Sequence, residues 1–260
     1  MKMYVLDNGE IIMKTSNQVS ADGKTASIPI HCFLIEGSKG YILFDTGCDP
    51  DGMEKNWPEK MRLNPYVPGN DKDILGSLEK LGLKSDDIRY VVLSHLHLDH
   101  AGGLKFFPNA DVFVNGDELA KTLKAYAKRD FSGFHMESDI ESWLKAEIKW
   151  HPIYSDIQKL ELDEGVTILN FGPGHSYGML GLMVNLEKSG KFILASDTIY
   201  TKAHIGPPVQ VAGIVYSQEG YVDTVNEIVR LAEKEKAMIL FGHDIDQFKT
   251  LIKSSDGYYC

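Results

Sequence analysis

The sequence predicts an α/β fold in which two β-sheets pack face to face and helices cover the outside. Each half of the chain contains a strand-rich segment followed by a helical one, and no Pro- or Ser-rich linker separates the halves. An Asp-Thr pair also follows a predicted strand in each half, at residues 45–46 and 197–198, which hints at an internal duplication. We therefore expect one domain that spans residues 1–260.

The first half begins with a predicted hairpin. Residues 32–37 and 41–45 are apolar runs, and the Ser38-Lys39-Gly40 segment between them is typical of a turn. Apolar residues then recur at helical spacing over 74–81, which indicates a short amphipathic helix. A strand predicted at 90–93 leads into a polar cluster that begins at residue 94.

The second half repeats this order of strands and helices. Residues 118–149 alternate charged and apolar side chains and are predicted to be mostly helical. Three strands joined by Gly-bearing turns are expected next, at 165–171, 181–186 and 191–195. A helical stripe around 225–232 precedes a last strand at 237–241, and this strand ends directly before Gly242-His243-Asp244.

Composition excludes several classes of protein. With 43% hydrophobic and 25% charged residues, the chain is typical of a globular protein with a sizeable core. A net charge of −10 disfavours binding to a phosphate backbone, so we expect no nucleic-acid partner. No apolar run approaches the roughly 18 residues that suggest a membrane span, and no signal sequence is evident, so we expect a cytoplasmic protein without membrane contact. The three cysteines form no C-x-x-C pair, which argues against a thiolate zinc site.

The chemistry is concentrated in the segment from Ser94 to Gly103, where three imidazoles and one carboxylate occur within six residues. His95 and His97 are two residues apart, and such residues share a face only in an extended chain. They therefore belong to a loop at the end of a strand, and Asp99 and His100 follow as the chain turns.

These side chains are donors that Zn²⁺ favours, because zinc in proteins takes imidazole nitrogen and carboxylate oxygen. One ion cannot use all four groups and keep an open position for a substrate. Three further donors follow predicted strands, namely His175, Asp197 and His243. Seven candidates suit two adjacent ions.

The run His95-Leu96-His97-Leu98-Asp99-His100 resembles the H-x-H-x-D-H signature of the metallo-β-lactamase superfamily, and the other landmarks follow in the expected order. The resemblance implies an αββα sandwich of two mixed sheets and a two-zinc site. It implies one ion on His95, His97 and His175, a second on Asp99, His100 and His243, and Asp197 as the bridge. Mn²⁺, Co²⁺ and Fe²⁺ accept the same donors.

Within the superfamily, the chain is most similar to N-acyl-homoserine lactonases, because Tyr200 lies three residues beyond Asp197 as it does in those enzymes. This likeness implies a cytoplasmic hydrolase that opens a lactone, namely an N-acyl homoserine lactone in quorum quenching, by attack of a dizinc-bridging hydroxide. Tyr200 would stabilise the oxyanion and Asp99 would carry a proton to the leaving alkoxide. Asp45 would orient a ligand imidazole.

Several alternatives stay open. Residues 244–250 resemble the corresponding part of 4-pyridoxolactonase, so another small lactone is a second candidate substrate. Thioester hydrolysis of the glyoxalase II type uses similar donors but adds a helical C-terminal region, whereas 17 residues follow His243 here. A non-catalytic metal-binding module is the candidate from a different class, although the chain keeps all seven donors. We expect a monomer or homodimer with a small-molecule lactone as partner, and structural roles for His31, His135, His151 and His204.

Overall fold

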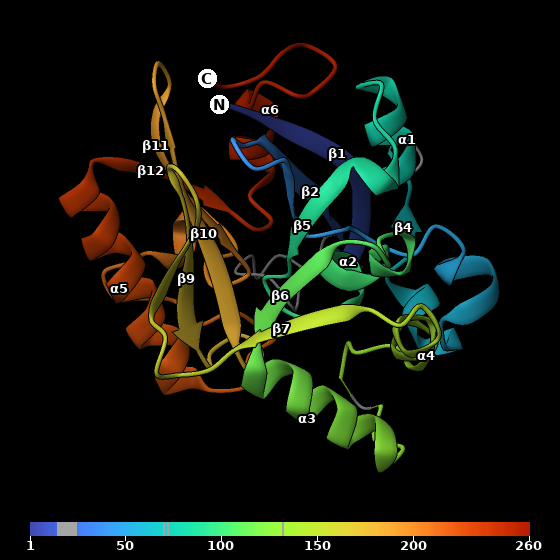
Figure 1. The fold of residues 1–260 in the computed structure, drawn as a ribbon. Coiled ribbons are helices and arrows are strands. Elements are labelled where there is room, and N and C mark those ends of the chain that lie inside the picture. The colour runs from blue at the N-terminus through green and yellow to red at the C-terminus, as the bar shows by residue number, and fades with distance from the viewer. Residues whose placement is uncertain (15–24, 70, 72, 132) are drawn as a thin grey trace.

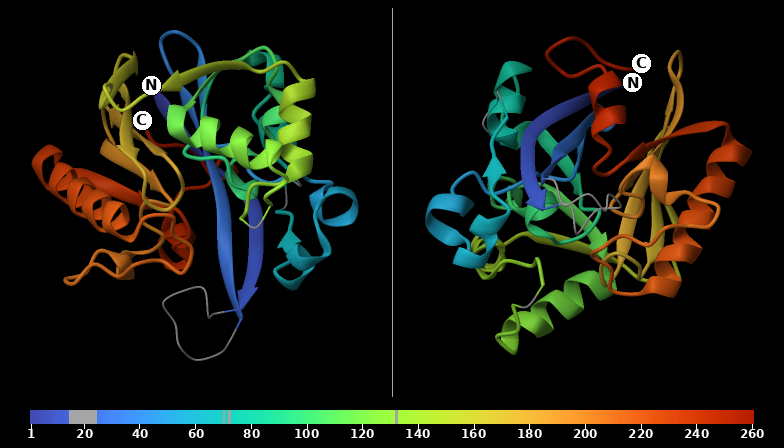
Figure 2. Two further views of the ribbon diagram at one scale, coloured as in Figure 1. Left: turned by 90° about the horizontal axis from the view of Figure 1, so that it is seen from below. Right: turned by 180° about the vertical axis from the view of Figure 1, so that it is seen from behind.

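The computed structural model describes residues 1–14, 25–69, 71, 73–131 and 133–260. Two mixed sheets pack face to face, and helices cover the outer face of each sheet, as the sequence predicts (Figure 1). The two views in Figure 2 show α5 on one side of this sandwich and α3 and α4 on the other.

The first sheet has seven strands in the order β4-β1-β2-β3-β5-β6-β7. Its strands are β1 (Lys2–Lys14), β2 (Thr25–Glu36), β3 (Tyr41–Phe44), β4 (Tyr66–Val67), β5 (Ile88–Val92), β6 (Asp111–Asn115) and β7 (Lys149–Ile153). The helices of this half are α1 (Ile74–Lys80), α2 (Leu98–Ala101), α3 (Gly116–Ala127) and α4 (Glu137–Lys145). Because β3, β5, β6 and β7 run parallel, their carboxyl ends meet at one edge of the sheet.

The second sheet has five strands in the order β12-β11-β10-β9-β8. They are β8 (Lys159–Asp163), β9 (Val166–Gly172), β10 (Met179–Leu186), β11 (Gly190–Ser196) and β12 (Ala237–Phe241), and the helices are α5 (Gln218–Glu235) and α6 (Ile245–Thr250). Short 3-10 turns occur at Glu59–Leu63, Ser85–Asp87, Leu104–Phe106 and Lys202–His204, and a π turn at Gly52–Asn56. The parallel pair β11–β12 places two further carboxyl ends side by side.

An apolar core between the sheets holds these strand ends in place. Side chains from both inner faces are buried there, among them Phe33, Phe44, Leu182 and Leu194. A second cluster lies between the first sheet and its helices, and a third lies beneath α5. The loops at the strand ends are therefore carried by close-packed elements, which fixes the positions of the side chains on them.

The strands predicted at 165–171, 181–186, 191–195 and 237–241 are confirmed within two residues at either end. By contrast, β2 begins seven residues before the predicted run at 32–37, and the predicted helical region 118–149 is divided into α3 and α4 and ends at the start of β7. Asp73 caps α1 by accepting a hydrogen bond from the Gly76 amide at 2.9 Å, as its sequence position suggests. The sequence did not reveal β1, β4, β6, β7 or β8, and α5 begins earlier than its apolar stripe, at a cap made by Ser217. Among the described residues, no helix is long and apolar enough to cross a membrane.

Candidate active site

The seven predicted donors converge at the edge of the sandwich where the strands end. The loop after β5 and the start of α2 carry His95, His97, Asp99 and His100. The connection from β9 to β10 carries His175, whereas Asp197 follows β11 and His243 follows β12. Segments that are more than 140 residues apart along the chain thus contribute to one site.

The donor atoms form two groups that share one carboxylate. His95, His97 and His175 place ligand atoms within 4.8 Å of one another, and so do Asp99, His100 and His243. Asp197 contacts members of both groups, since its oxygens lie 3.2 Å from His100 Nε2, 3.3 Å from His175 Nε2 and 3.1 Å from His243 Nε2. His95, His100 and Asp197 form a further cluster of this kind, and the assignment of each donor to one ion stays a prediction.

Unpartnered buried atoms indicate that the donor set fits metal ions. His95 Nε2, His100 Nε2 and Asp197 Oδ1 are buried and make no hydrogen bond to the described residues. Leaving such atoms without a partner costs about 1 to 3 kcal/mol each, so native proteins rarely do so. All three atoms face the same space, and imidazole nitrogen and carboxylate oxygen are what Zn²⁺ and related ions bind. The residues present therefore fit a pair of divalent cations.

Four of the imidazoles are held by a hydrogen bond at the nitrogen that faces away from this space. His95 Nδ1 lies 3.0 Å from the Ser94 hydroxyl oxygen. His100 Nδ1 lies 2.8 Å from Asp45 Oδ2, His175 Nδ1 lies 2.9 Å from the Ile214 carbonyl, and His243 Nδ1 lies 3.0 Å from the Pro29 carbonyl. Each acceptor keeps the proton on Nδ1 and leaves the Nε2 lone pair free for a cation.

Asp45 plays the orienting role that its position after β3 predicts. Its backbone is in the left-handed region with φ of 61°, and its carboxylate also accepts hydrogen bonds from the Ser94 amide at 2.7 Å and the Ser94 hydroxyl at 2.8 Å. The strained turn aims the carboxylate at His100, and such turns concentrate at functional sites.

Charge in the site shifts the pKa values of its members. Burial favours the neutral acid at Asp197, but His243 and His100 outweigh it and hold the pKa of this carboxyl well below its usual range. Burial likewise favours neutral His100, yet Asp99 and Asp197 raise the pKa of this imidazole well above its usual value. The carboxylates thus give the site a negative potential that attracts a positive charge.

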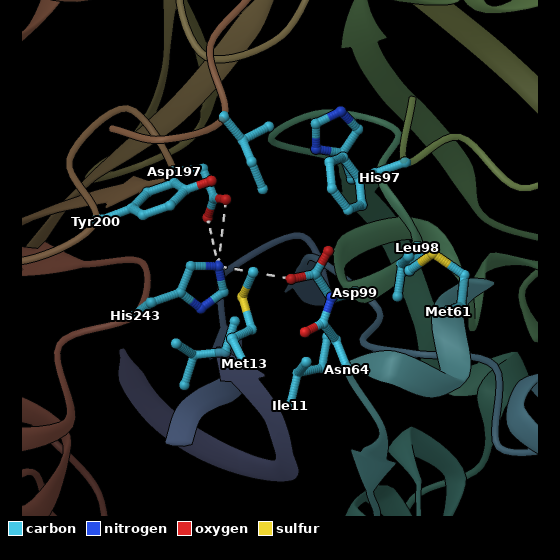
Figure 3. Close-up of a pocket in the computed structure, with 13 residues that line it drawn as sticks. Ile11, Met13, Met61, Asn64, His97, Leu98, Asp99, Asp197, Tyr200 and His243 are labelled. Atoms are coloured by element: carbon cyan, nitrogen blue, oxygen red, sulfur yellow. Dashed lines mark hydrogen bonds and ion pairs between the residues drawn. The ribbon is translucent and has the colours of Figure 1, made fainter. Parts of the chain in front are cut away.

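A largely apolar pocket opens beside these donors (Figure 3). Asp99, Asp197 and His243 border it together with Tyr200, and its walls are mainly aliphatic or aromatic: Ile11, Met13, Ile28, Met61, Leu98, Phe134 and Ile214. Leu98 of the histidine-rich segment therefore lines the pocket.

Tyr200 lies beside the donors from both groups. Its ring is 5.2 Å from the ring of His175 and 5.2 Å from that of His243, and its hydroxyl oxygen is 3.1 Å from His175 Nδ1. Burial raises the pKa of the Tyr200 phenol well above its usual value, and the negative charges of Asp197 and Asp99 raise it further. The hydroxyl therefore keeps its proton and remains a hydrogen-bond donor over the neutral range.

Two residues next to the site were not identified from the sequence. His135 packs edge-on against His97 with ring centres 4.7 Å apart, and its Nε2 lies 2.9 Å from Glu118 Oε1. Glu118 stands in the first turn of α3, where an acidic residue is common, so nothing in the sequence marks it. By contrast, His204 is buried behind Tyr200 and does not line the pocket, which agrees with its predicted structural role.

The fold and the site together define a family. Residues 28–243 match the sequence model of the metallo-β-lactamase superfamily, and the chain belongs to that superfamily. The predicted likeness to lactonases within it is also confirmed. The chain is 42% identical over 272 residues to N-acyl homoserine lactonase AiiB of Agrobacterium fabrum, a match that covers 99% of each protein.

Solved structures support the same grouping. The chain resembles the Bacillus thuringiensis AiiA mutant F107W with N-decanoyl-L-homoserine bound at its active site, with a TM-score of 0.83 and 28% identity, covering 100% of this chain and 98% of the other. It also resembles an N-acyl homoserine lactone hydrolase with the product N-hexanoyl-L-homoserine at the catalytic metal centre, with a TM-score of 0.83, 27% identity and the same coverage.

Proposed function

We propose that this protein is a metal-dependent lactonase that hydrolyses N-acyl homoserine lactones, a quorum-quenching activity. The observation that carries the proposal is the joining of two donor groups through Asp197 at the mouth of an apolar pocket. An N-acyl homoserine lactone has a polar ring and an apolar acyl chain, which suit the donors and the pocket respectively. The AiiB and AiiA relatives carry this activity in their names.

The ester carbon of a lactone is attacked by water only slowly unless that water is activated. Bound cations would supply this activation, by lowering the pKa of bound water and by acting as a Lewis acid toward the ester carbonyl. His95, His97 and His175 would hold one cation, Asp99, His100 and His243 would hold the other, and Asp197 would serve both. Zn²⁺ is the expected ion for both sites, and Mn²⁺, Co²⁺ and Fe²⁺ suit the same donors.

Side chains of this protein supply the remaining steps. The Tyr200 hydroxyl donates a hydrogen bond to the carbonyl oxygen as negative charge develops on it. Asp99 borders the pocket with a side chain that is 12% exposed, so it can take the proton released on attack and pass it to the alkoxide that leaves when the ring opens. The apolar walls hold the acyl chain and keep bulk water away from the ester.

The pocket favours acyl-homoserine lactones over the rival substrates. 4-Pyridoxolactone is a compact polar ring system and would leave the apolar walls without a partner. A glutathione thioester carries charged groups, whereas among the described lining residues other than the donors and Tyr200, the polar side chain is the amide of Asn64. The monomeric or homodimeric state and the cytoplasmic location remain predictions from the sequence.

A substrate panel tests the proposal. Proton release would be measured in a pH-stat with zinc-loaded protein and with short- and long-chain N-acyl homoserine lactones, 4-pyridoxolactone, a thioester and a cephalosporin. We expect the acyl-homoserine lactones to give the highest kcat/KM. If another member of the panel were preferred, or if protein loaded with both cations were inert toward all of them, the proposal would be wrong.

A further inference from the structure

A single buried carboxylate ties together two of the loops that carry the predicted metal ligands. Glu118 is fully buried at the start of α3. Its Oε1 accepts a hydrogen bond from the Leu96 amide at 2.9 Å, and its Oε2 accepts one from the Gly178 amide at 3.1 Å. Leu96 lies between His95 and His97, whereas Gly178 belongs to the loop that carries His175.

Two further donors complete the environment of this carboxylate. Ser176 directly follows His175 in the chain. Its hydroxyl oxygen lies 2.9 Å from Glu118 Oε1 and 2.8 Å from Glu118 Oε2. His135 Nε2 lies 2.9 Å from Oε1, and the His135 ring packs against His97. Glu118 therefore contacts the immediate neighbours of His95 and His175 and, through His135, supports the ring of His97.

The start of α3 holds Glu118 in register with these loops. The Asn115 side chain caps the helix by accepting hydrogen bonds from the amides of Asp117 at 2.9 Å and Glu118 at 3.1 Å. Gly178 packs so closely on this cap that a Cβ there would lie 1.9 Å from Asn115 Oδ1. The cap and the His175 loop thus form one rigid unit, and the carboxylate is pre-positioned within it.

We infer that Glu118 is a positioning residue for the cation of the His95, His97 and His175 group, acting through the Leu96 amide, the Ser176–Gly178 segment and His135. Asp45 contacts His100 of the other group directly and reaches His95 only through the Ser94 hydroxyl, so Glu118 is the buried carboxylate that touches both loops of the first group. The inference rests on the metal centre of the proposed hydrolase, but it does not depend on which substrate that hydrolase takes.

Chemistry requires a carboxylate rather than an amide at this position. Each oxygen of Glu118 faces a backbone N–H, and a backbone N–H can only donate. In a Glu118→Gln variant the NH₂ group must face either Leu96 or Gly178, so one of the two loops loses its attachment. Removing a residue that orients metal ligands typically lowers metal affinity by about 10- to 100-fold.

The test measures zinc affinity in stripped protein by competition with a chromophoric chelator. We expect Glu118→Gln to lower the affinity for one of the two zinc ions by about 10- to 100-fold and to leave the affinity for the other within about threefold of the parental value. Metal analysis at low free zinc should give one ion per chain, and a crystal structure grown under those conditions should show it among Asp99, His100 and His243. Excess zinc should restore both the second ion and kcat.

Asp139→Asn is the matched control. Asp139 is also a fully buried carboxyl, burial raises its pKa well above the usual value, and its Oδ2 has no hydrogen-bond partner among the described residues. We expect this variant to bind both ions with parental affinity. Two ions of parental affinity in Glu118→Gln, or equal weakening of both ions, would overturn the inference.

Ser176→Ala keeps the test decisive if Glu118→Gln does not fold. It removes one donor to the carboxylate and leaves both backbone attachments in place. We expect the same single ion to bind several-fold more weakly, and unchanged affinity for both ions would overturn the inference.

Discussion

Replacing Tyr200 by phenylalanine separates the proposed catalytic role of the hydroxyl from the packing role of the ring. The ring is 5% exposed and packs against His175 and His243, and phenylalanine preserves those contacts. His175 Nδ1 already donates its proton to the Ile214 carbonyl at 2.9 Å, so it cannot also accept one from the phenol. Loss of the hydroxyl should therefore cost at most about 1 kcal/mol of folding free energy.

The effect on catalysis should be much larger. If the Tyr200 hydroxyl stabilises the developing oxyanion, its removal should lower kcat by about ten- to a thousand-fold, which corresponds to about 1.4 to 4 kcal/mol of activation free energy. The assay is kcat for an N-acyl homoserine lactone in a pH-stat, with the metal content and thermal stability of each preparation measured in parallel.

Tyr221→Phe provides a matched control for this prediction. Tyr221 is fully buried in α5, its hydroxyl lacks a hydrogen-bond partner among the described residues, and it does not line the pocket. We expect kcat of this variant to equal that of the parent. An unchanged kcat in Tyr200→Phe, or an equal decrease in both variants, would refute the reasoning.

Three further predictions concern the site, the pocket and the pH dependence of stability. Asp45→Asn should lower the affinity of the Asp99, His100 and His243 group for its cation by about 10- to 100-fold. The reason is that an amide NH₂ facing His100 Nδ1 would move the imidazole proton to Nε2. Chelator competition would measure the affinity, and a parental value would contradict the prediction. Met61→Ala should enlarge the pocket and shift kcat/KM toward longer acyl chains by about tenfold, whereas an unchanged chain-length profile would remove Met61 from substrate selection. Burial and the nearby His243 lower the pKa of His31 to about 3, so the unfolded chain binds a proton below about pH 6.5 that the folded protein does not. Stability contributed by neutral His31 is therefore present above pH 6.5 and is lost as pH falls toward 3. In denaturation measurements at pH 5, His31→Phe should reduce this loss of unfolding free energy by on the order of 1 to 2 kcal/mol. An equally steep pH profile in the variant would contradict the prediction.

Much of the site could be predicted because its donors lie in short motifs at strand ends. The spacing of His95 and His97 indicates an extended loop, and His175, Asp197 and His243 each follow a recognisable strand. Sheet geometry then brings these ends together, since parallel strands deliver their carboxyl ends to one edge. Asp45 could be placed near the donors for the same reason.

Other features depend on tertiary contacts that leave no local pattern. Glu118 has the sequence position of an ordinary helix-start acid, and only packing shows that it faces Leu96 and Gly178. His135 could not be told from a structural histidine, because its contact with His97 joins segments about 40 residues apart. Strand β1 was missed since Asp7, Asn8 and Gly9 interrupt its apolar alternation at the point where its register with β2 shifts.

The central claim is that Asp197 joins two cation sites into one centre. Anomalous diffraction from crystals of zinc-loaded protein, collected on both sides of the zinc absorption edge, tests it most directly. We predict two zinc peaks per chain about 3.5 to 4 Å apart. The Asp197 carboxylate should contact both peaks. A single peak, or two peaks too far apart to share Asp197, would contradict the account.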